Sequence, residues 1–187
     1  MKENQITLFG LTLKAIVVHT ITYFLVGLVA STVFNYASDF AQADMRTWMR
    51  QTDDPIVALG PALQFLRGIL FALAFYPLRE ILFGRKNGWL VTWLLLVMVG
   101  ILSTFAPASG SVEGVIYTIL PVREQFLSGG FLEVLTQSFL LSGILYYWVN
   151  HPEKRWLNWV LGILFVLVLL MSLLGYLAAS GYLAVPA

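Results

Sequence analysis

Long apolar stretches recur along almost the whole chain, and this feature limits the possible folds more than any other. A helix that crosses a membrane needs about 20 mainly apolar residues. Lipid offers the backbone no hydrogen-bond partner, so such segments have to be helices, and the alternation typical of barrel strands is missing. The sequence therefore predicts an all-α fold, a polytopic membrane helix bundle of about five transmembrane helices. The expected spans are approximately 8–36, 56–83, 89–106, 126–149 and 157–179.

The composition supports a single transmembrane domain over residues 1–187. Hydrophobic residues make up 59% of the chain and charged residues 11%, whereas an average soluble domain has about 45–50% and 25%. The apolar stretches leave no room for a separate soluble domain. The first stretch is also longer than the apolar region of a signal peptide, which is about 7–15 residues, so we expect it to remain as a membrane helix.

Two connecting segments are expected to lie at the outer membrane surface. Residues 37–54 carry apolar and polar side chains on opposite faces, which predicts a short interfacial helix. It ends at Thr52-Asp53-Asp54-Pro55, where cap residues precede a proline and predict the start of the second span. Residues 112–122 are too few to cross a membrane, so this segment is predicted to lie on the surface or to re-enter the bilayer partly.

The positions of lysine and arginine predict the orientation, because these residues are enriched in cytoplasmic loops. If the chain crosses five times, seven basic residues fall on the N-terminal side and three on the other. The expectation is therefore a plasma or inner membrane protein with its N-terminus cytoplasmic and its C-terminus outside. The first group is Lys2, Lys14, Arg79, Arg85, Lys86, Lys154 and Arg155, and the second is Arg46, Arg50 and Arg123.

Several function classes are disfavoured by what the sequence lacks. A net charge of +1 gives no footprint for nucleic acid. The absence of cysteine excludes thiol chemistry, and two histidines cannot form a multi-histidine metal site. No phosphate-binding loop, zinc-binding helix motif or nucleophile elbow is present, so we expect no cofactor or metal. The expected partners are the bilayer itself and either a second copy of the chain or another membrane subunit.

Five polar residues fall inside the expected spans: His19, Gln64, Arg67, Glu133 and Gln137. A charged residue there costs about 2.5–3.5 kcal/mol on insertion scales, so each is a candidate for ligand binding or proton coupling. Counted from the cytoplasmic ends at about 1.5 Å per residue, His19, Arg67 and Gln137 lie near the bilayer midplane.

We therefore expect an intramembrane pocket in which Arg67 pairs with Glu133, and in which Gln64, Gln137 and His19 complete the hydrogen bonds. The alternative is an ion pair that only fixes how the helices pack. Candidate gate or outer-mouth residues are Glu113, Arg123 and Glu124.

Three functions remain open from the sequence. The first is binding or transport of a small polar or anionic molecule or a lipid headgroup, with Arg67 as counter-ion. The second is an intramembrane enzyme that acts on a lipid-type substrate, with Glu133, Glu113 or His19 as acid or base. The third is an accessory or assembly subunit that binds no ligand.

Overall fold

The computed structural model describes residues 6–47 and 49–183, and helices account for all regular structure in these ranges. Lys2, which the orientation argument used, lies outside the described residues. In chain order the helices are α1 (Leu8–Val33), α2 (Tyr36–Phe40), α3 (Ala43–Arg46), α4 (Pro55–Leu63), α5 (Phe65–Phe75), η1 (Tyr76–Leu78), α6 (Arg79–Leu82), α7 (Gly88–Leu95), the π-helical segment η2 (Leu96–Leu102), α8 (Val112–Tyr117), α9 (Val122–Leu127), α10 (Gly129–Asn150) and α11 (Arg155–Ala179).

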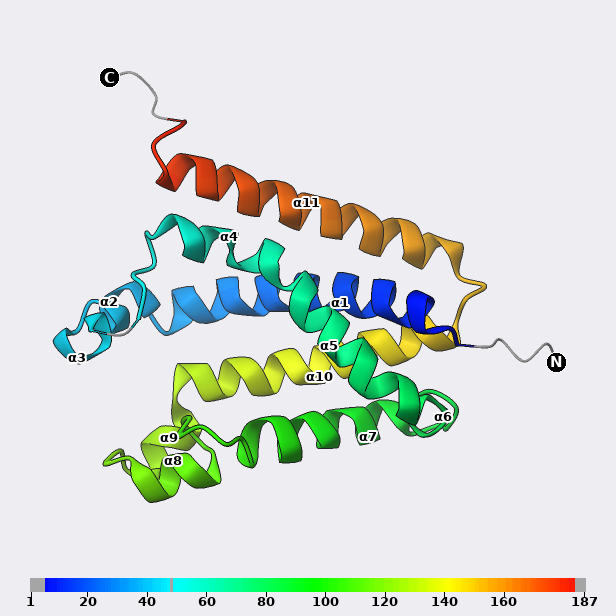
Figure 1. Cartoon of the computed structure of the whole chain (residues 1–187), viewed down its shortest axis with the longest axis horizontal. Helices are drawn as coiled ribbons and strands as arrows, with labels where there is room; N and C mark the ends of the chain where they lie inside the picture. The colour runs from blue at the N-terminus through cyan, green and yellow to red at the C-terminus, as the bar shows by residue number, and fades with distance from the viewer. Residues whose placement is uncertain (1–5, 48, 184–187) are drawn as a thin grey trace.

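Helix α1 lies at the centre of the bundle. It packs against α5, α10 and α11, while α11 also packs against α4, and α10 against α7. In Figure 1, α11, α1, α10 and α7 lie one below the other with similar directions, and α4–α5 runs obliquely from beside α11 across α1 and α10. Buried side chains such as Val18, Phe75 and Leu145 form the apolar core between these helices. This arrangement places one face of α1 between α5 and α10.

Three of the five predicted spans are helices long and apolar enough to cross a membrane: Leu8–Val33, Pro55–Leu82 and Arg155–Ala179. The third prediction corresponds to Gly88–Leu102, which is apolar but shorter. The fourth corresponds to α10, which has 22 residues and includes polar side chains such as Glu133 and Gln137. The structure thus supports a helical membrane protein, and the five-span bundle remains a prediction.

The second span is interrupted in its first half, and the cause is local. Pro61 lies inside α4 and has no N–H to donate. The adjacent backbone pair, the Ala58 carbonyl and the Ala62 N–H, is separated by the Ser172 hydroxyl of α11. This hydroxyl donates to the Ala58 carbonyl (2.7 Å) and accepts from the Ala62 N–H (3.4 Å), so it is inserted where the two groups would otherwise bond each other. A side chain inserted into the helical ladder is a known cause of helix kinks. The helix restarts after Gln64, which lies at the break between α4 and α5.

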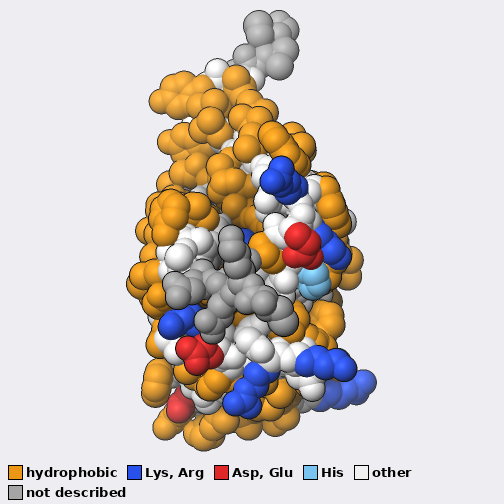
Figure 2. Space-filling model, turned by 90° about the vertical axis from the view of Figure 1, so that its right-hand side faces the viewer, with side chains coloured by type: hydrophobic (Ala, Val, Ile, Leu, Met, Phe, Trp, Pro, Cys, Tyr) orange, Lys and Arg blue, Asp and Glu red, His pale blue; other side chains and the backbone are white. Residues whose placement is uncertain are grey.

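The two ends of the bundle differ in their connections. The start of α1, the turn between α6 and α7, and the connection from α10 to α11 lie at one end, and lysine and arginine side chains gather there (Figures 1 and 2). Helices α2, α3, α8 and α9 and the last described residues lie at the other end. The loops that the charge count assigned to one side therefore do lie together.

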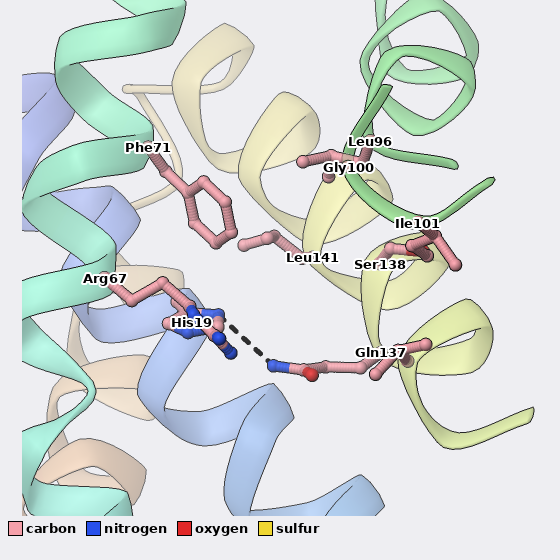
Figure 3. Close-up of a pocket in the computed structure, with 10 residues that line it drawn as sticks. His19, Arg67, Phe71, Leu96, Gly100, Ile101, Gln137, Ser138 and Leu141 are labelled. Atoms are coloured by element: carbon pink, nitrogen blue, oxygen red, sulfur yellow. Dashed lines mark hydrogen bonds between the residues drawn. The ribbon is translucent and has the colours of Figure 1, made fainter. Parts of the chain in front are cut away.

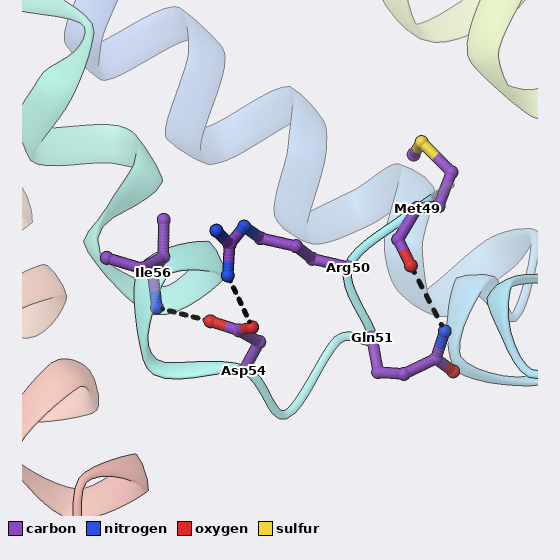
Figure 4. Close-up of polar contacts among 5 residues, drawn as sticks. All are labelled: Met49, Arg50, Gln51, Asp54 and Ile56. Atoms are coloured by element: carbon purple, nitrogen blue, oxygen red, sulfur yellow. Dashed lines mark hydrogen bonds and ion pairs between the residues drawn. The ribbon is translucent and has the colours of Figure 1, made fainter. Parts of the chain in front are cut away.

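The predicted interfacial helix over 37–54 is wrong in its extent. The structure has two short helices, α2 and α3, because Gln42 between them is extended (φ −62°, ψ 147°). The Gln51 side chain then donates to the Phe40 and Met49 carbonyls and folds the segment back on α2. The predicted start of the second span is confirmed: Asp54 caps α4 by accepting from the Ile56 N–H (2.9 Å) and pairs with Arg50 at 2.8 Å (Figure 4).

The predicted segment 112–122 is also divided, into α8 and the start of α9. Gln125 is fully buried between them and donates to the Leu120 carbonyl (2.8 Å) and the Thr118 hydroxyl (3.3 Å). The outer surface of the α8–α9 hairpin carries large apolar side chains, since Ile119 is fully exposed and Ile116 is 63% exposed. This hairpin therefore buries a polar side chain and exposes several large apolar ones, together with the charged Arg123 and Glu124 of α9.

Candidate functional site: an imidazole between two amides and a cavity beside Arg67

His19, Gln64 and Gln137 form a hydrogen-bonded chain across three helices. His19 is buried on α1, with its Nε2 3.1 Å from Gln64 Oε1 at the α4–α5 break and its Nδ1 3.2 Å from Gln137 Nε2 on α10. Phe71 of α5 packs edge-on against the imidazole at 5.0 Å between ring centres. The structure thus brings together these three polar residues, which the sequence assigned to one interior.

The direction of each hydrogen bond in this series of side chains is set by the Gly60 carbonyl at its start. The Gly60 carbonyl can only accept, and it accepts from Gln64 Nε2 (3.3 Å), so Gln64 turns its oxygen to His19. His19 Nε2 must then carry the proton and donate. Its Nδ1 is left as an acceptor for the Gln137 amide N–H. The chain therefore selects a neutral imidazole with one tautomer, and both ring nitrogens are occupied.

Arg67 lines a cavity of about 230 Å³ together with His19 and Gln137. Figure 3 shows this cavity between α5, α1, α10 and η2, with Phe71 and Leu141 on its walls. Within residues 6–47 and 49–183, Arg67 has no hydrogen bond and no acidic partner. Arg67 is an exposed residue of α5, so its guanidinium is a cation without an ion-pair partner at the edge of an otherwise largely apolar cavity.

The expected ion pair between Arg67 and Glu133 is not formed. Glu133 Oε2 instead accepts from the Tyr36 hydroxyl at 2.7 Å. Its Oε1 leans towards α1, where a Cβ added at Gly27 would lie 3.3 Å from it. The chain reverses after α1 at Asn35, which has φ 49° in the left-handed region, and this turn brings Tyr36 back to α10. The pairing prediction was wrong because a nearer partner from an unexpected turn occupies the carboxylate.

Two further cavities adjoin Glu133 and Tyr36. One of about 540 Å³ lies between α2, η2 and the start of α10, and one of about 560 Å³ lies between α1, α4 and α11. Glu133, Tyr36 and Phe40 line both of them. The first also shares Gly100 and other lining residues with the Arg67 cavity. The three cavities therefore form a linked series in which Arg67 lies at one end and Glu133 further along.

The three candidate gate residues lie away from these cavities. Glu113 is in the first turn of α8, where the hydroxyl of Ser111 caps the helix by accepting from the Gly114 N–H at 2.9 Å. A carboxylate at that position is favoured by the helix dipole. Arg123 and Glu124 are exposed on α9. None of the three is among the residues that line the cavities beside Arg67 or Glu133.

Sequence reasoning missed three contributors to the site. Tyr36 was assigned to the end of the first span, and its contact with Glu133 depends on the turn at Asn35. Phe71 resembles any other apolar residue of its helix. Gly100 lies in the π-helical segment η2, a type of distortion that often occurs at functional sites. No sequence signal distinguished that segment from an ordinary apolar helix.

Searches of protein-family models, of curated proteins and of solved structures give no match to this chain. In the described part of the chain, no three histidine, cysteine, aspartate or glutamate side chains come together as metal ligands. The function therefore has to be argued from the geometry of the site.

Proposed function

We propose that this membrane protein binds an amphiphilic molecule whose anionic group lies beside Arg67. The observation that carries the proposal is the guanidinium without an acidic partner on the wall of the 230 Å³ cavity. Arg67 is exposed on α5, and an unpaired charge on an apolar membrane helix is costly, so a ligand that supplies the opposite charge gains a large interaction there. The Gln137 amide, which uses one N–H on His19, has its second N–H for the same ligand.

The remaining walls favour an amphiphile over a free anion. Phe71, Leu96 and Leu141 line the cavity, and the two adjoining cavities are also mainly apolar. Such walls fit an alkyl chain, while the guanidinium fits a phosphate or carboxylate. Acid–base catalysis by His19 has less support, because both ring nitrogens bond to amides and Glu133 bonds to Tyr36.

The proposal includes a topology of five crossings. Helix α10 has the length to cross, since 22 residues at about 1.5 Å each give about 33 Å. Residues 88–102 give only about 22 Å of a hydrocarbon core of about 30 Å. The α8–α9 hairpin that follows would lie in the outer leaflet above them, with exposed Ile116 and Ile119 in lipid and the charged Arg123 and Glu124 at the headgroups. The N-terminus would then be cytoplasmic, as the basic loops indicate.

Native mass spectrometry of the purified protein in dodecyl maltoside tests the binding. The probes are dioleoylphosphatidic acid, dioleoylglycerol with the same chains and no charge, and inorganic phosphate. We expect phosphatidic acid to bind at least tenfold more tightly than dioleoylglycerol, and Arg67→Gln to remove that preference, because a charge-assisted hydrogen bond is worth about 1.5–3 kcal/mol. Arg155→Gln, which removes an exposed arginine at one end of the bundle, is the control. Equal binding of the two lipids would overturn the proposal, and binding of phosphate as tight as that of the lipid would replace the amphiphile with a free anion.

A cavity-filling variant gives an independent test. A Cβ added at Gly100 meets nothing within 4 Å, and Gly100 lines the Arg67 cavity. Gly100→Leu should therefore fill the site without a clash and weaken phosphatidic acid binding at least tenfold. Gly162→Leu on α11 is the matched control, because Gly162 also meets nothing within 4 Å and lines none of these cavities. Unchanged binding to Gly100→Leu would place the lipid elsewhere.

Single cysteines test the topology, because the chain has none of its own. In inside-out and right-side-out vesicles, a membrane-impermeant thiol reagent should label Asn87→Cys only from the cytoplasmic side and Thr52→Cys only from the outer side. A bimane label on Ile119→Cys should be quenched by brominated lipid and shielded from aqueous iodide. Iodide quenching equal to that of labelled Thr52→Cys would remove the hairpin from the bilayer.

A further inference from the structure

The Glu133 carboxylate faces surroundings unlike those of Arg67. Its Oε2 accepts from the Tyr36 hydroxyl, and its Oε1 has no hydrogen-bond partner within the described ranges. No lysine or arginine there lies within ion-pair distance of it. A second uncompensated charge of opposite sign thus lies in the same linked series of cavities.

Aromatic rings surround this carboxylate on one side. Tyr36 stacks on Phe40 with ring centres 5.5 Å apart and planes 8° from parallel. Tyr23 and Phe24 of α1 line the same 560 Å³ cavity as Tyr36, Phe40 and Glu133. Aromatic faces attract cations, and aromatic walls beside a carboxylate are the usual arrangement for recognition of quaternary ammonium groups. An alkylammonium group fits this cavity better than an anion or a neutral polar group does.

The spacing of the two charged sites suits one small headgroup. Glu133 and Gln137 lie on successive turns of α10, about 6 Å apart along its axis. Gln137 lines the Arg67 cavity and Glu133 the adjoining ones. Residues Gly100, Ile101 and Val134 belong to the walls of both the Arg67 cavity and the next. An anionic and a cationic group a few bonds apart could therefore reach the two sites at once.

We propose that the ligand is zwitterionic, with its anionic group at Arg67 and its ammonium group against Glu133 and the rings of Tyr36 and Phe40. This inference rests on the proposed binding at Arg67 and names the class of ligand more closely. It also explains why the arginine and the glutamate do not pair with each other: each is held by its own surroundings, at the spacing of a headgroup that carries both charges.

Four lipids with the same dioleoyl chains separate the two charges: phosphatidylcholine is zwitterionic, phosphatidic acid anionic, trimethylammonium-propane cationic and dioleoylglycerol uncharged. Native mass spectrometry measures their affinities for the wild-type protein, Glu133→Gln and Arg67→Gln. Phosphatidylcholine should bind at least tenfold more tightly than phosphatidic acid to the wild type. Glu133→Gln should remove this preference and the binding of the cationic lipid. Arg67→Gln should weaken the anionic and zwitterionic lipids and leave the cationic one unchanged.

The controls keep the two proposals apart. Glu153→Gln removes an exposed carboxylate between α10 and α11 and should change none of the ratios. If phosphatidic acid binds through Arg67 but Glu133→Gln leaves the ratio of phosphatidylcholine to phosphatidic acid affinity unchanged, the zwitterion is overturned and the anion site stands. If Arg67→Gln changes no affinity, the anion site itself fails.

Two further measurements complete the test. Should Glu133→Gln not yield folded protein, Phe40→Leu keeps the carboxylate and removes one ring, and it should lower the affinity for both trimethylammonium lipids at least threefold. No change in Phe40→Leu would overturn the ammonium site. Free phosphocholine should displace phosphatidylcholine only weakly, because it lacks the acyl chains, and displacement at the same concentration as the lipid would make the ligand a soluble zwitterion.

Discussion

The amide–imidazole chain and the two charged residues lie within a few helical turns of one another, yet they differ in how their polar atoms are satisfied. Every atom that joins Gly60, Gln64, His19 and Gln137 has a partner and a defined direction. Arg67 has no hydrogen-bond or ion-pair partner in the described structure, and Glu133 has one on only one of its oxygens. Satisfied buried polar groups hold a fold in one arrangement, whereas unsatisfied charges beside a cavity indicate binding. Residue type and depth, which made all five look equivalent in the sequence, do not reveal this difference.

The close crossing of α1 and α5 underlies both halves of this comparison, and breaking it should have the largest effect. A Cβ at Gly68 would lie 2.6 Å from the Ile16 Cα, which is backbone and cannot move aside. Gly68→Leu should therefore separate the helices, pull Gln64 from His19 and cost about 3 kcal/mol of stability. Thermal unfolding in dodecyl maltoside measures this, with Gly162→Leu as control. A loss as small as that of the control would mean that α1 and α5 do not cross this closely.

The second effect concerns the amide–imidazole chain alone. His19→Leu leaves the side chains of Gln64 and Gln137 without their shared partner, so it should cost about 1–3 kcal/mol of stability. The triple change Gln64→Leu, His19→Leu and Gln137→Leu should recover stability, because no amide is then left unpaired. A triple variant less stable than His19→Leu would show that the amide–imidazole hydrogen bonds stabilise the fold beyond pairing their own polar atoms.

The charged residues should behave in the opposite way. Arg67→Gln and Glu133→Gln should each change the unfolding free energy of the lipid-free protein by less than about 1 kcal/mol, because neither breaks an ion pair and the amide oxygen of the second variant can still accept from the Tyr36 hydroxyl. Combined, the two should add within about 0.5 kcal/mol. Coupling of more than about 1 kcal/mol in a double-mutant cycle would indicate a direct pair and would return these residues to a structural role.

The smallest effect is expected at the exposed cap of α4. The hydrogen bond from the Ile56 N–H, and then the one from Arg50, lower the pKa of Asp54 below its ordinary value of 3.8. A carboxyl whose pKa is lowered by folding stabilises the protein above its unfolded pKa, and this contribution is lost as the pH falls through the folded value. Asp54→Ala should thus lower Tm slightly at pH 7, by an amount that shrinks as the pH is lowered past the ordinary value of 3.8, while Asp54→Asn keeps the cap. A Tm difference that persists in acid would contradict the assignment.

The sequence predicted the helices better than their contacts. The start of the second span at Asp54-Pro55 follows from local rules of helix capping. The break at Gln64 could not be predicted from Pro61 alone, because the Ser172 hydroxyl that interrupts the helix there comes from a residue 110 positions away from Ala62 in the chain. The site followed the same pattern: the residues that share an interior were found, and the partner of Glu133 was not.

The amino-acid sequence by itself determined that this chain forms apolar helices and that a few costly polar groups lie within them, because hydrophobicity and helix signals are properties of neighbouring residues. Only the tertiary structure decided which of those groups satisfy one another. Hydrogen bonds and ion pairs depend on a few tenths of an ångström and on the turn at Asn35 and the kink beside Pro61, and both bring together residues that are far apart in the chain.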